Sequence, residues 1–110
     1  MTRKKILKNT ESYHDSLIAS LQDPNELQAY IKIAVEDYQE TKDIKSLLVS
    51  LRNVAEAKGG MSKLAEKTNL NRQSLYKTLS LQGNPRLDTF ETLLHELGFQ
   101  LLIQPIDRAS

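Results

Sequence analysis

The side chains with the most informative chemistry lie in one run, MSKLAEKTNLNRQSLYKTLS, at positions 61–80. In the major groove of DNA, an arginine can donate two hydrogen bonds to guanine, and a glutamine can form a matching pair with adenine. Arg72 and Gln73 are therefore the first candidates for reading bases. Lys77 lies about one helical turn further on, where it could reach a base or a phosphate, and Tyr76 would flank the contacted strand.

Polar and basic residues around these positions could hold the protein on the DNA backbone. Hydroxyl, amide, ammonium and guanidinium groups all donate to phosphate oxygens, and such contacts set the register without reading sequence. The predicted phosphate contacts are Ser62, Lys63, Asn71, Ser74, Asn84 and Arg86. The competing interpretation is that all of these side chains only form a solvated helix face.

Two short helices joined by a tight turn would position these side chains. A small residue is needed where two such helices cross, and Ala65 provides it. Asn69 falls in the turn, where asparagine is the best substitute for glycine in a left-handed conformation. Asn71 is suited to cap the second helix through its side-chain oxygen. The expected small core between the helices consists of Leu64, Leu70, Leu75 and Leu79. This spacing is typical of a helix-turn-helix.

The rest of the chain is predicted to be mainly helical. Apolar residues recur at helical spacing over residues 10–21, 24–41, 43–57 and 87–97. Asp23, Pro24 and Glu26 form a strong helix start, and Gly98 is suited to end the last helix. The positions expected to face the core include Tyr13, Tyr30, Tyr38 and Leu87.

The net charge of +1 conceals an uneven distribution along the chain. Residues 1–8 carry +4, residues 9–41 carry −6 and residues 42–58 carry +2. Residues 59–86, which include the candidate DNA contacts, carry +4, and residues 87–110 carry −3. A basic block inside an otherwise acidic chain indicates a surface that binds a polyanion, although scattered solvated lysines would give the same distribution.

The composition excludes several classes of protein. With 39% hydrophobic and 26% charged residues, the chain fits one globular domain. It has no cysteine, no apolar run of about 18 residues and no apolar region after the basic N-terminus. We therefore expect a cytoplasmic protein without a membrane partner. His14 and His95 are isolated, and neither a serine elbow nor a phosphate-binding loop is present, so we expect neither an enzyme nor a bound metal or other cofactor.

The segment LAEKTNLNRQSLYKTLSLQGNPRLDTFETLLHELGF resembles the helix-turn-helix of the phage-repressor (Xre/Cro) superfamily. Its surroundings, YHDSLIASLQDPNELQAYIKIAVE upstream and GNPRLDTF downstream, are similar to those of addiction-module antidote proteins, the HigA-type antitoxins. The resemblance covers roughly residues 13–105. It implies an all-α, phage-repressor-like bundle with N-terminal helices and a short C-terminal β-strand.

The resemblance implies two activities. Such antidotes bind the double-stranded DNA operator of their own operon as repressors, and they neutralise a cognate toxin, commonly a RelE/HigB-like ribonuclease that cleaves mRNA. The chain would then divide into an N-terminal helical extension (1–41), a DNA-binding domain (42–98) and a C-terminal strand and tail (99–110). The alternatives are a solitary Xre-family transcription regulator and a toxin-capping module that has lost contact with DNA.

Two features outside the motif are assigned to protein partners. The acidic block at residues 9–41 would oppose phosphate and suits a cationic, RNA-binding toxin, with an ordinary solvated face as the alternative. Phe99, Leu101 and Ile103 alternate with other side chains in the pattern of a short strand over residues 99–104. A lone strand needs a hydrogen-bonding partner. We expect it either to pair with its two-fold mate in a homodimer or to join the edge of the toxin's sheet.

Overall fold

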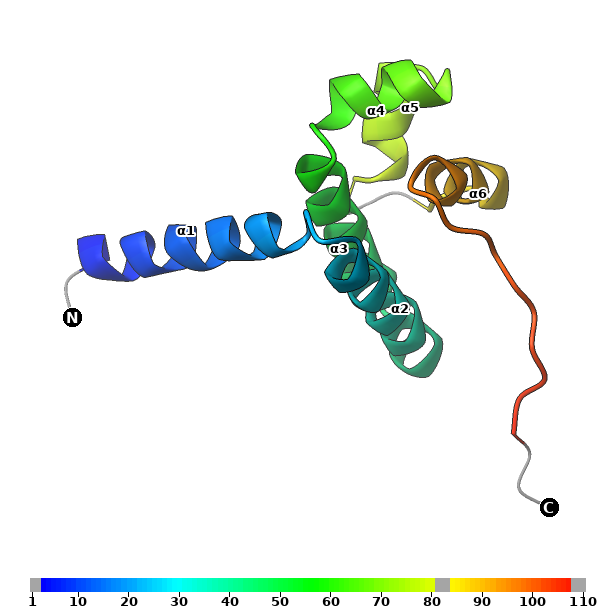
Figure 1. Cartoon of the computed structure of the whole chain (residues 1–110), viewed down its shortest axis with the longest axis horizontal. Helices are drawn as coiled ribbons and strands as arrows, with labels where there is room; N and C mark the ends of the chain where they lie inside the picture. Colours follow the sequence, from blue (N-terminus) through cyan, green and yellow to red (C-terminus); the bar gives the residue numbers. More distant parts are fainter. Residues whose placement is uncertain (1–2, 81–83, 108–110) are drawn as a thin grey trace.

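The computed structural model describes residues 3–80 and 84–107 (Figure 1). All regular secondary structure in these ranges is α-helical. Side chains are described for residues 12–71, 73–80 and 84–107. The helices are α1 (Arg3–Ser20), α2 (Pro24–Thr41), α3 (Ile44–Ala57), α4 (Met61–Thr68), α5 (Arg72–Thr78) and α6 (Leu87–Glu96). The all-α prediction is confirmed for this part of the chain. The division into segments at residues 41 and 98 stays a prediction.

Local capping explains where the central helices begin. The Asp23 carboxylate accepts a hydrogen bond from the backbone N–H of Asn25 at 2.8 Å, and Pro24 opens α2 with a backbone angle that suits a helix. The Asp43 carboxylate does the same for α3 by accepting from Lys45 and Ser46. These groups satisfy N–H donors that lack partners within the helix, so both helix starts follow from the sequence.

The first helix projects from the body, and side chains of its C-terminal part pack against the core (Figure 1). Leu17 and Ile18 pack against the core, and His14 Nε2 lies 2.8 Å from Glu56 Oε2 on α3. α1 begins at Arg3, well before the predicted start near residue 10, because no glycine or proline interrupts it. Tyr13 lies on the projecting part and is 79% exposed, so its predicted burial is wrong. Tyr30 and Tyr38 pack against the core as predicted.

Two clusters of buried side chains hold the remaining helices together, and α3 and α6 contribute to both. The first joins α3, α4, α5 and α6 through buried residues that include Leu48, Leu64, Leu75 and Leu93. The second joins the end of α1 and α2 to α3 and α6 through Leu21, Leu27, Ile31, Val54, Ala57 and Leu94. Val35 and Phe90 pack against both clusters, so the two form one continuous core.

The predicted C-terminal strand is absent. Phe99 packs against the second cluster, but residues 99–107 then run outward as an irregular chain, which we call the C-terminal segment (Figure 1). Leu101 and Ile103 are exposed together with Leu102. Three consecutive aliphatic residues interrupt the alternation that a strand needs, and the described part of the chain offers no second strand as a ladder partner.

Candidate nucleic-acid interface

The helices α4 and α5 and the turn between them form a compact pair, which we call the α4–α5 unit. Ala65 is buried between the helices, and Asn69 adopts the left-handed conformation with φ 59° and ψ 17°. Leu64, Leu75 and Leu79 are buried as predicted, whereas Leu70 is half-buried. Ala65 is therefore the small residue at the contact between the two helices, and Asn69 is the left-handed residue of the turn, as their positions in the sequence predicted.

Asn71 fixes the first turn of α5. Its Oδ1 accepts hydrogen bonds from the backbone N–H groups of Gln73 at 2.7 Å and Ser74 at 3.4 Å. The side-chain oxygen of Asn71 is thus used within the protein, and any contact with phosphate would come from its amide nitrogen. This cap sets the direction in which the side chains of α5 leave the unit.

The described base-contact candidates lie on the outer face of α5. Gln73 and Lys77 are exposed, and Tyr76 is exposed beside them. Arg72 is the first residue of α5, but its side chain lies outside the described part of the structure. Among the candidates for phosphate contacts, Ser74 is also exposed on α5, and the α4 candidates Ser62 and Lys63 are exposed near the start of that helix.

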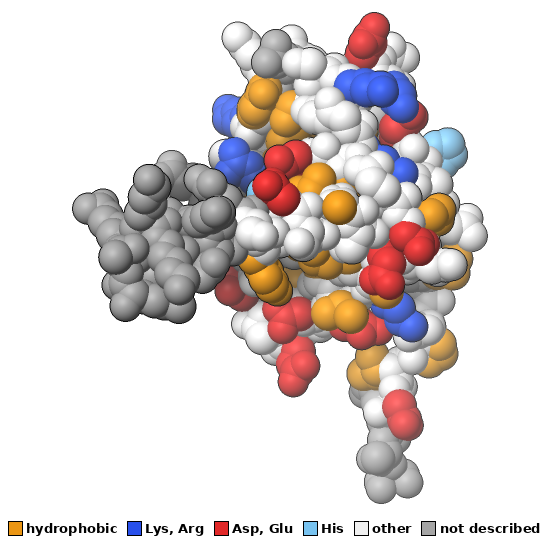
Figure 2. All heavy atoms as spheres, turned by 60° about the vertical axis from the view of Figure 1, so that its left-hand side comes forward, with side chains coloured by type: hydrophobic (Ala, Val, Ile, Leu, Met, Phe, Trp, Pro, Cys, Tyr) orange, Lys and Arg blue, Asp and Glu red, His pale blue; other side chains and the backbone are white. Residues whose placement is uncertain are grey.

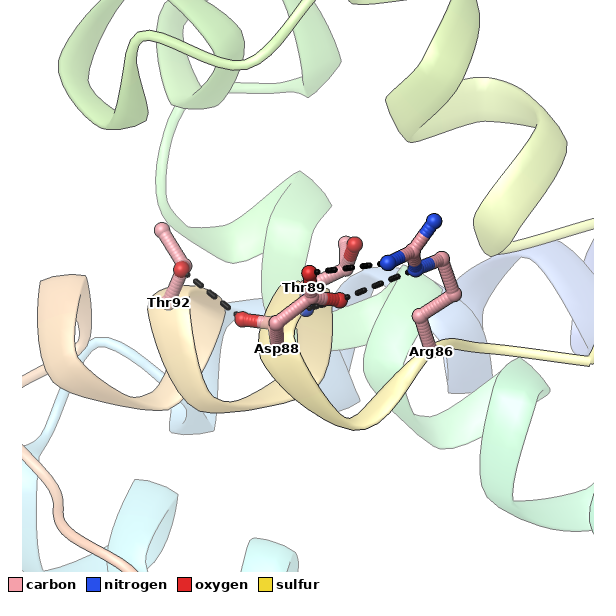
Figure 3. A network of polar contacts seen from close by, with 4 residues as sticks. All are labelled: Arg86, Asp88, Thr89 and Thr92. Atoms are coloured by element: carbon pink, nitrogen blue, oxygen red, sulfur yellow. Dashed lines mark hydrogen bonds and ion pairs between the residues drawn. The ribbon is translucent and has the colours of Figure 1, made fainter.

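Arg86 is held in an ion pair at the start of α6 (Figure 3). Its Nε and Nη2 donate to the two carboxylate oxygens of Asp88 at 3.2 and 3.3 Å, and Asp88 Oδ1 also accepts from the backbone N–H of Thr89 at 2.8 Å. Both charged groups are exposed, so the pair adds little to stability. It instead fixes the guanidinium and offsets its charge.

Asp88 is a residue that the sequence interpretation did not identify. The available signal was its acidic side chain in the first turn of a helix, two positions after Arg86. Such a position favours a carboxylate for the helix dipole alone, so the spacing did not point to an arginine partner.

Asn84 lines a groove between α2 and α6. The groove has a volume of about 610 Å³ and includes Asn84 and Pro85 in its lining. Leu87, which was predicted to face the core, also lines this groove and is 72% exposed, so that prediction is wrong. Helical periodicity assigned Leu87 to the apolar face of α6 correctly, but none of the described helices covers that face at the beginning of α6.

Acidic and basic side chains are distributed differently over the molecule. In Figure 2 most of the Lys and Arg side chains lie over the upper part, where α4 and α5 lie, whereas Asp and Glu side chains lie over both the upper and the lower parts. The exposed acidic residues of α1, α2 and the turn between them include Asp15, Asp23, Glu26, Glu36, Asp37 and Glu40. We call these six residues the acidic face. Residues 1–8 lie outside the described side chains.

Among the described residues, no group of three or more His, Asp or Glu side chains is placed to hold a metal ion. No helix in the same part of the chain combines the length and apolar character needed to cross a membrane.

Comparison with known proteins extends over most of the chain. A family model described as probable addiction module antidote protein matches residues 11–105. A protein of Haemophilus influenzae without an assigned function is 33% identical over 97 residues, which cover 86% of this chain and 94% of that protein. No solved structure gives a significant match. The family match includes α2 to α6 and the C-terminal part of α1. The chain therefore belongs to the family of probable addiction module antidote proteins.

Proposed function

We propose that this protein is the antitoxin of a type II toxin–antitoxin module. In this role it neutralises a RelE/HigB-like, mRNA-cleaving toxin by direct binding and, as a homodimer, represses transcription of its own operon. The observation that carries the antitoxin role is family membership over residues 11–105. Operator DNA and mRNA are both cytoplasmic in a bacterium, so we place the protein there.

The α4–α5 unit supports the operator-binding part of the proposal. In a helix-turn-helix of the Xre family, the N-terminal part of the second helix enters the major groove, and that helix is α5 here. Gln73 and Lys77 are exposed on it, and the Gln73 amide suits adenine. Arg72 opens the same helix and is our candidate for guanine. A two-fold dimer would present two such helices to half-sites about 34 Å apart.

The acidic face supports the toxin-binding part. A ribonuclease that binds mRNA carries a cationic surface, and opposite charges across an interface accelerate association and exclude wrong partners. The same acidic face would repel phosphate, which directs DNA towards the α4–α5 unit. Each face of the molecule would therefore select one of the two partners by charge.

Operator binding is tested with the DNA fragment upstream of the protein's own gene. We expect the double variant Gln73→Ala, Lys77→Ala to lose about 30-fold or more in affinity for this fragment, because a base contact is worth about 1–3 kcal/mol. Lys32→Ala, which removes an exposed lysine from α2, is the matched control and should bind normally. Equal affinities for the double variant and the wild type would refute the assignment of α5.

Toxin binding is tested with the product of the neighbouring open reading frame. We expect a small basic protein that forms a stable complex with this chain and loses its mRNA cleavage in that complex. Deleting residues 1–41 is a poor test, because it would remove Leu27 and Ile31 from the core. Operator binding without any toxin complex would favour a solitary regulator, and toxin binding without operator binding would favour a toxin-capping module.

A further inference from the structure

The C-terminal segment and the groove beside it are both apolar and both uncovered. Leu101, Leu102, Ile103 and Ile106 are all exposed, and Ile103, at 102%, is as accessible to solvent as in an extended peptide. The groove between α2 and α6, which we call the α2–α6 groove, is lined largely by Val35, Tyr38, Ile44, Leu87, Phe90 and Leu101. A continuous exposed apolar surface of this kind marks an interaction site.

We propose that residues 102–107 of one copy of this chain occupy the α2–α6 groove of a second copy, and that the same segment of the second copy occupies the groove of the first. Leu101 lines the groove of its own chain, and the segment then leads away from the body, so it leaves the groove open. A reciprocal exchange about a two-fold axis covers both apolar surfaces of both copies at once. The proposal deepens the homodimer part of the proposed function and is independent of operator and toxin binding.

The size of the segment suits this role. The six residues 102–107 reach about 20 Å when extended, so several of their aliphatic side chains can contact the groove of a second copy. Contact is made through aliphatic side chains on the segment and through aliphatic and aromatic side chains in the groove, so no strand ladder is required. The absence of a strand in the described chain is therefore compatible with this interface.

Charge favours a second copy over the toxin as the occupant. Lys42 is the only charged side chain among the described residues that line the groove, and its Nζ lies 5.8 Å from the centre of the Tyr38 ring. Asp107 is the one charged side chain in the described segment. The groove and the segment that we propose to fill it therefore carry opposite charges, which favours their association. A cationic toxin would find no carboxylate there, whereas the acidic face offers several.

The first test measures the mass of the protein in solution by light scattering and sedimentation. We expect the wild type to be a dimer and Ile103→Asp to raise the dimer dissociation constant about 100-fold, because a carboxylate would have to enter an apolar groove. Ile33→Asp is the matched control, since Ile33 is 64% exposed on α2 and does not line the groove. It should remain a dimer, and all three proteins should show the same helical circular dichroism.

The second test identifies the contact by cross-linking, which is simple because the chain has no cysteine. A Leu87→Cys chain is mixed with a mass-tagged Ile103→Cys chain and oxidised with glutathione disulfide. We expect a disulfide between the two different chains, and none when Ile33→Cys replaces Leu87→Cys. A disulfide only between two Ile103→Cys chains would show that the segments lie against each other and would overturn the proposal.

Two other results would also overturn it. In the doubly substituted chain Leu87→Cys, Ile103→Cys, a disulfide within a monomer would show that the segment closes on its own groove. A wild-type dimer that is unchanged by Ile103→Asp and gives no cross-link would refute the exchange but leave the homodimer in place. A monomeric wild type would refute both, while toxin binding would still be measured separately.

Discussion

At the scale of single residues, two asparagines of the α4–α5 unit perform different tasks. Asn69 accepts the left-handed backbone of the turn, and Asn71 supplies the oxygen that starts α5. The two tasks are separable by substitution, because the first depends on the backbone preference of the residue and the second on a side-chain acceptor.

We expect Asn71→Ala to lower the free energy of unfolding by about 1 kcal/mol, because two backbone N–H groups of α5 lose their acceptor. Asn71→Ser keeps an acceptor of similar reach and is expected to recover most of this loss. Urea unfolding followed by circular dichroism measures both variants. Equal stability of the alanine and serine variants would show that the cap does not hold α5.

The ion pair of Arg86 and Asp88 controls how much charge the start of α6 presents. We expect Asp88→Asn to change stability by less than about 1 kcal/mol, because the pair is exposed. If this surface meets DNA, the released Arg86 should raise affinity for a random duplex and steepen the slope of log K against log salt by about 1. Fluorescence anisotropy over a salt series measures the slope.

Glu91→Gln is the control for this substitution, since it makes the same change of charge at another exposed position of α6. A general effect of net charge would alter both variants equally. An effect that belongs to the ion pair would appear only in Asp88→Asn.

The residues that sequence reasoning located correctly are those whose roles are local. Asn69 and Asn71 follow from backbone conformation and capping over two or three neighbouring residues. Tyr13 and Leu87 were misplaced because periodicity gives the apolar face of a helix but not the point at which the neighbouring helix stops covering it. The partner of Arg86 depends on side-chain rotamers that no spacing rule specifies.

At the scale of elements, α5 is too short to be stable alone and depends on its contact with the rest of the core. Leu75 provides that contact and is completely buried in the first cluster. We expect Leu75→Ala to reduce the free energy of unfolding by about 2–5 kcal/mol, because the substitution leaves a cavity. Chemical denaturation measures the loss.

Ile33→Ala removes the same kind of side chain from an exposed position and should change stability by about 0.5 kcal/mol or less. A small loss in Leu75→Ala would mean that α5 is anchored elsewhere.

The helix starts could be predicted from the sequence, whereas the C-terminal segment and the groove could not. The predicted start of α2 at the capping Asp23 is confirmed, and the range predicted for α3 agrees with a helix that Asp43 caps. The C-terminal strand failed because a strand is defined by its neighbour, and the alternation of Phe99, Leu101 and Ile103 carries no information about that neighbour. The α2–α6 groove could not be predicted either, since it depends on how distant helices meet.

At the scale of the whole molecule, the near-neutral net charge results from acidic and basic blocks of the sequence that cancel each other. We expect the triple variant Glu36→Lys, Asp37→Lys, Glu40→Lys to associate with the toxin about 10-fold more slowly at low salt. The difference should shrink as salt is added, because screening weakens interactions between exposed charges. Stopped-flow mixing with the purified toxin measures the rate.

The control Glu91→Lys, Glu96→Lys reverses acidic residues on α6, outside the acidic face. The triple variant changes the net charge by +6 and the control by +4, so slowing of both in proportion to these changes would indicate that only net charge matters. Unchanged association of the triple variant would remove the acidic face from the toxin interface.

Val35 and Phe90 connect the two clusters of the core, so the acidic face and the α4–α5 unit rest on one folded body. A body of this size with a continuous core is expected to unfold in a single transition. A ligand that binds only the folded state at 100 times its dissociation constant adds about 2.7 kcal/mol to the stability of the whole body. Binding of either partner would therefore also protect the face that it does not touch against unfolding and proteolysis. The lifetime of the protein in the cell would increase with the fraction of molecules that have a partner bound.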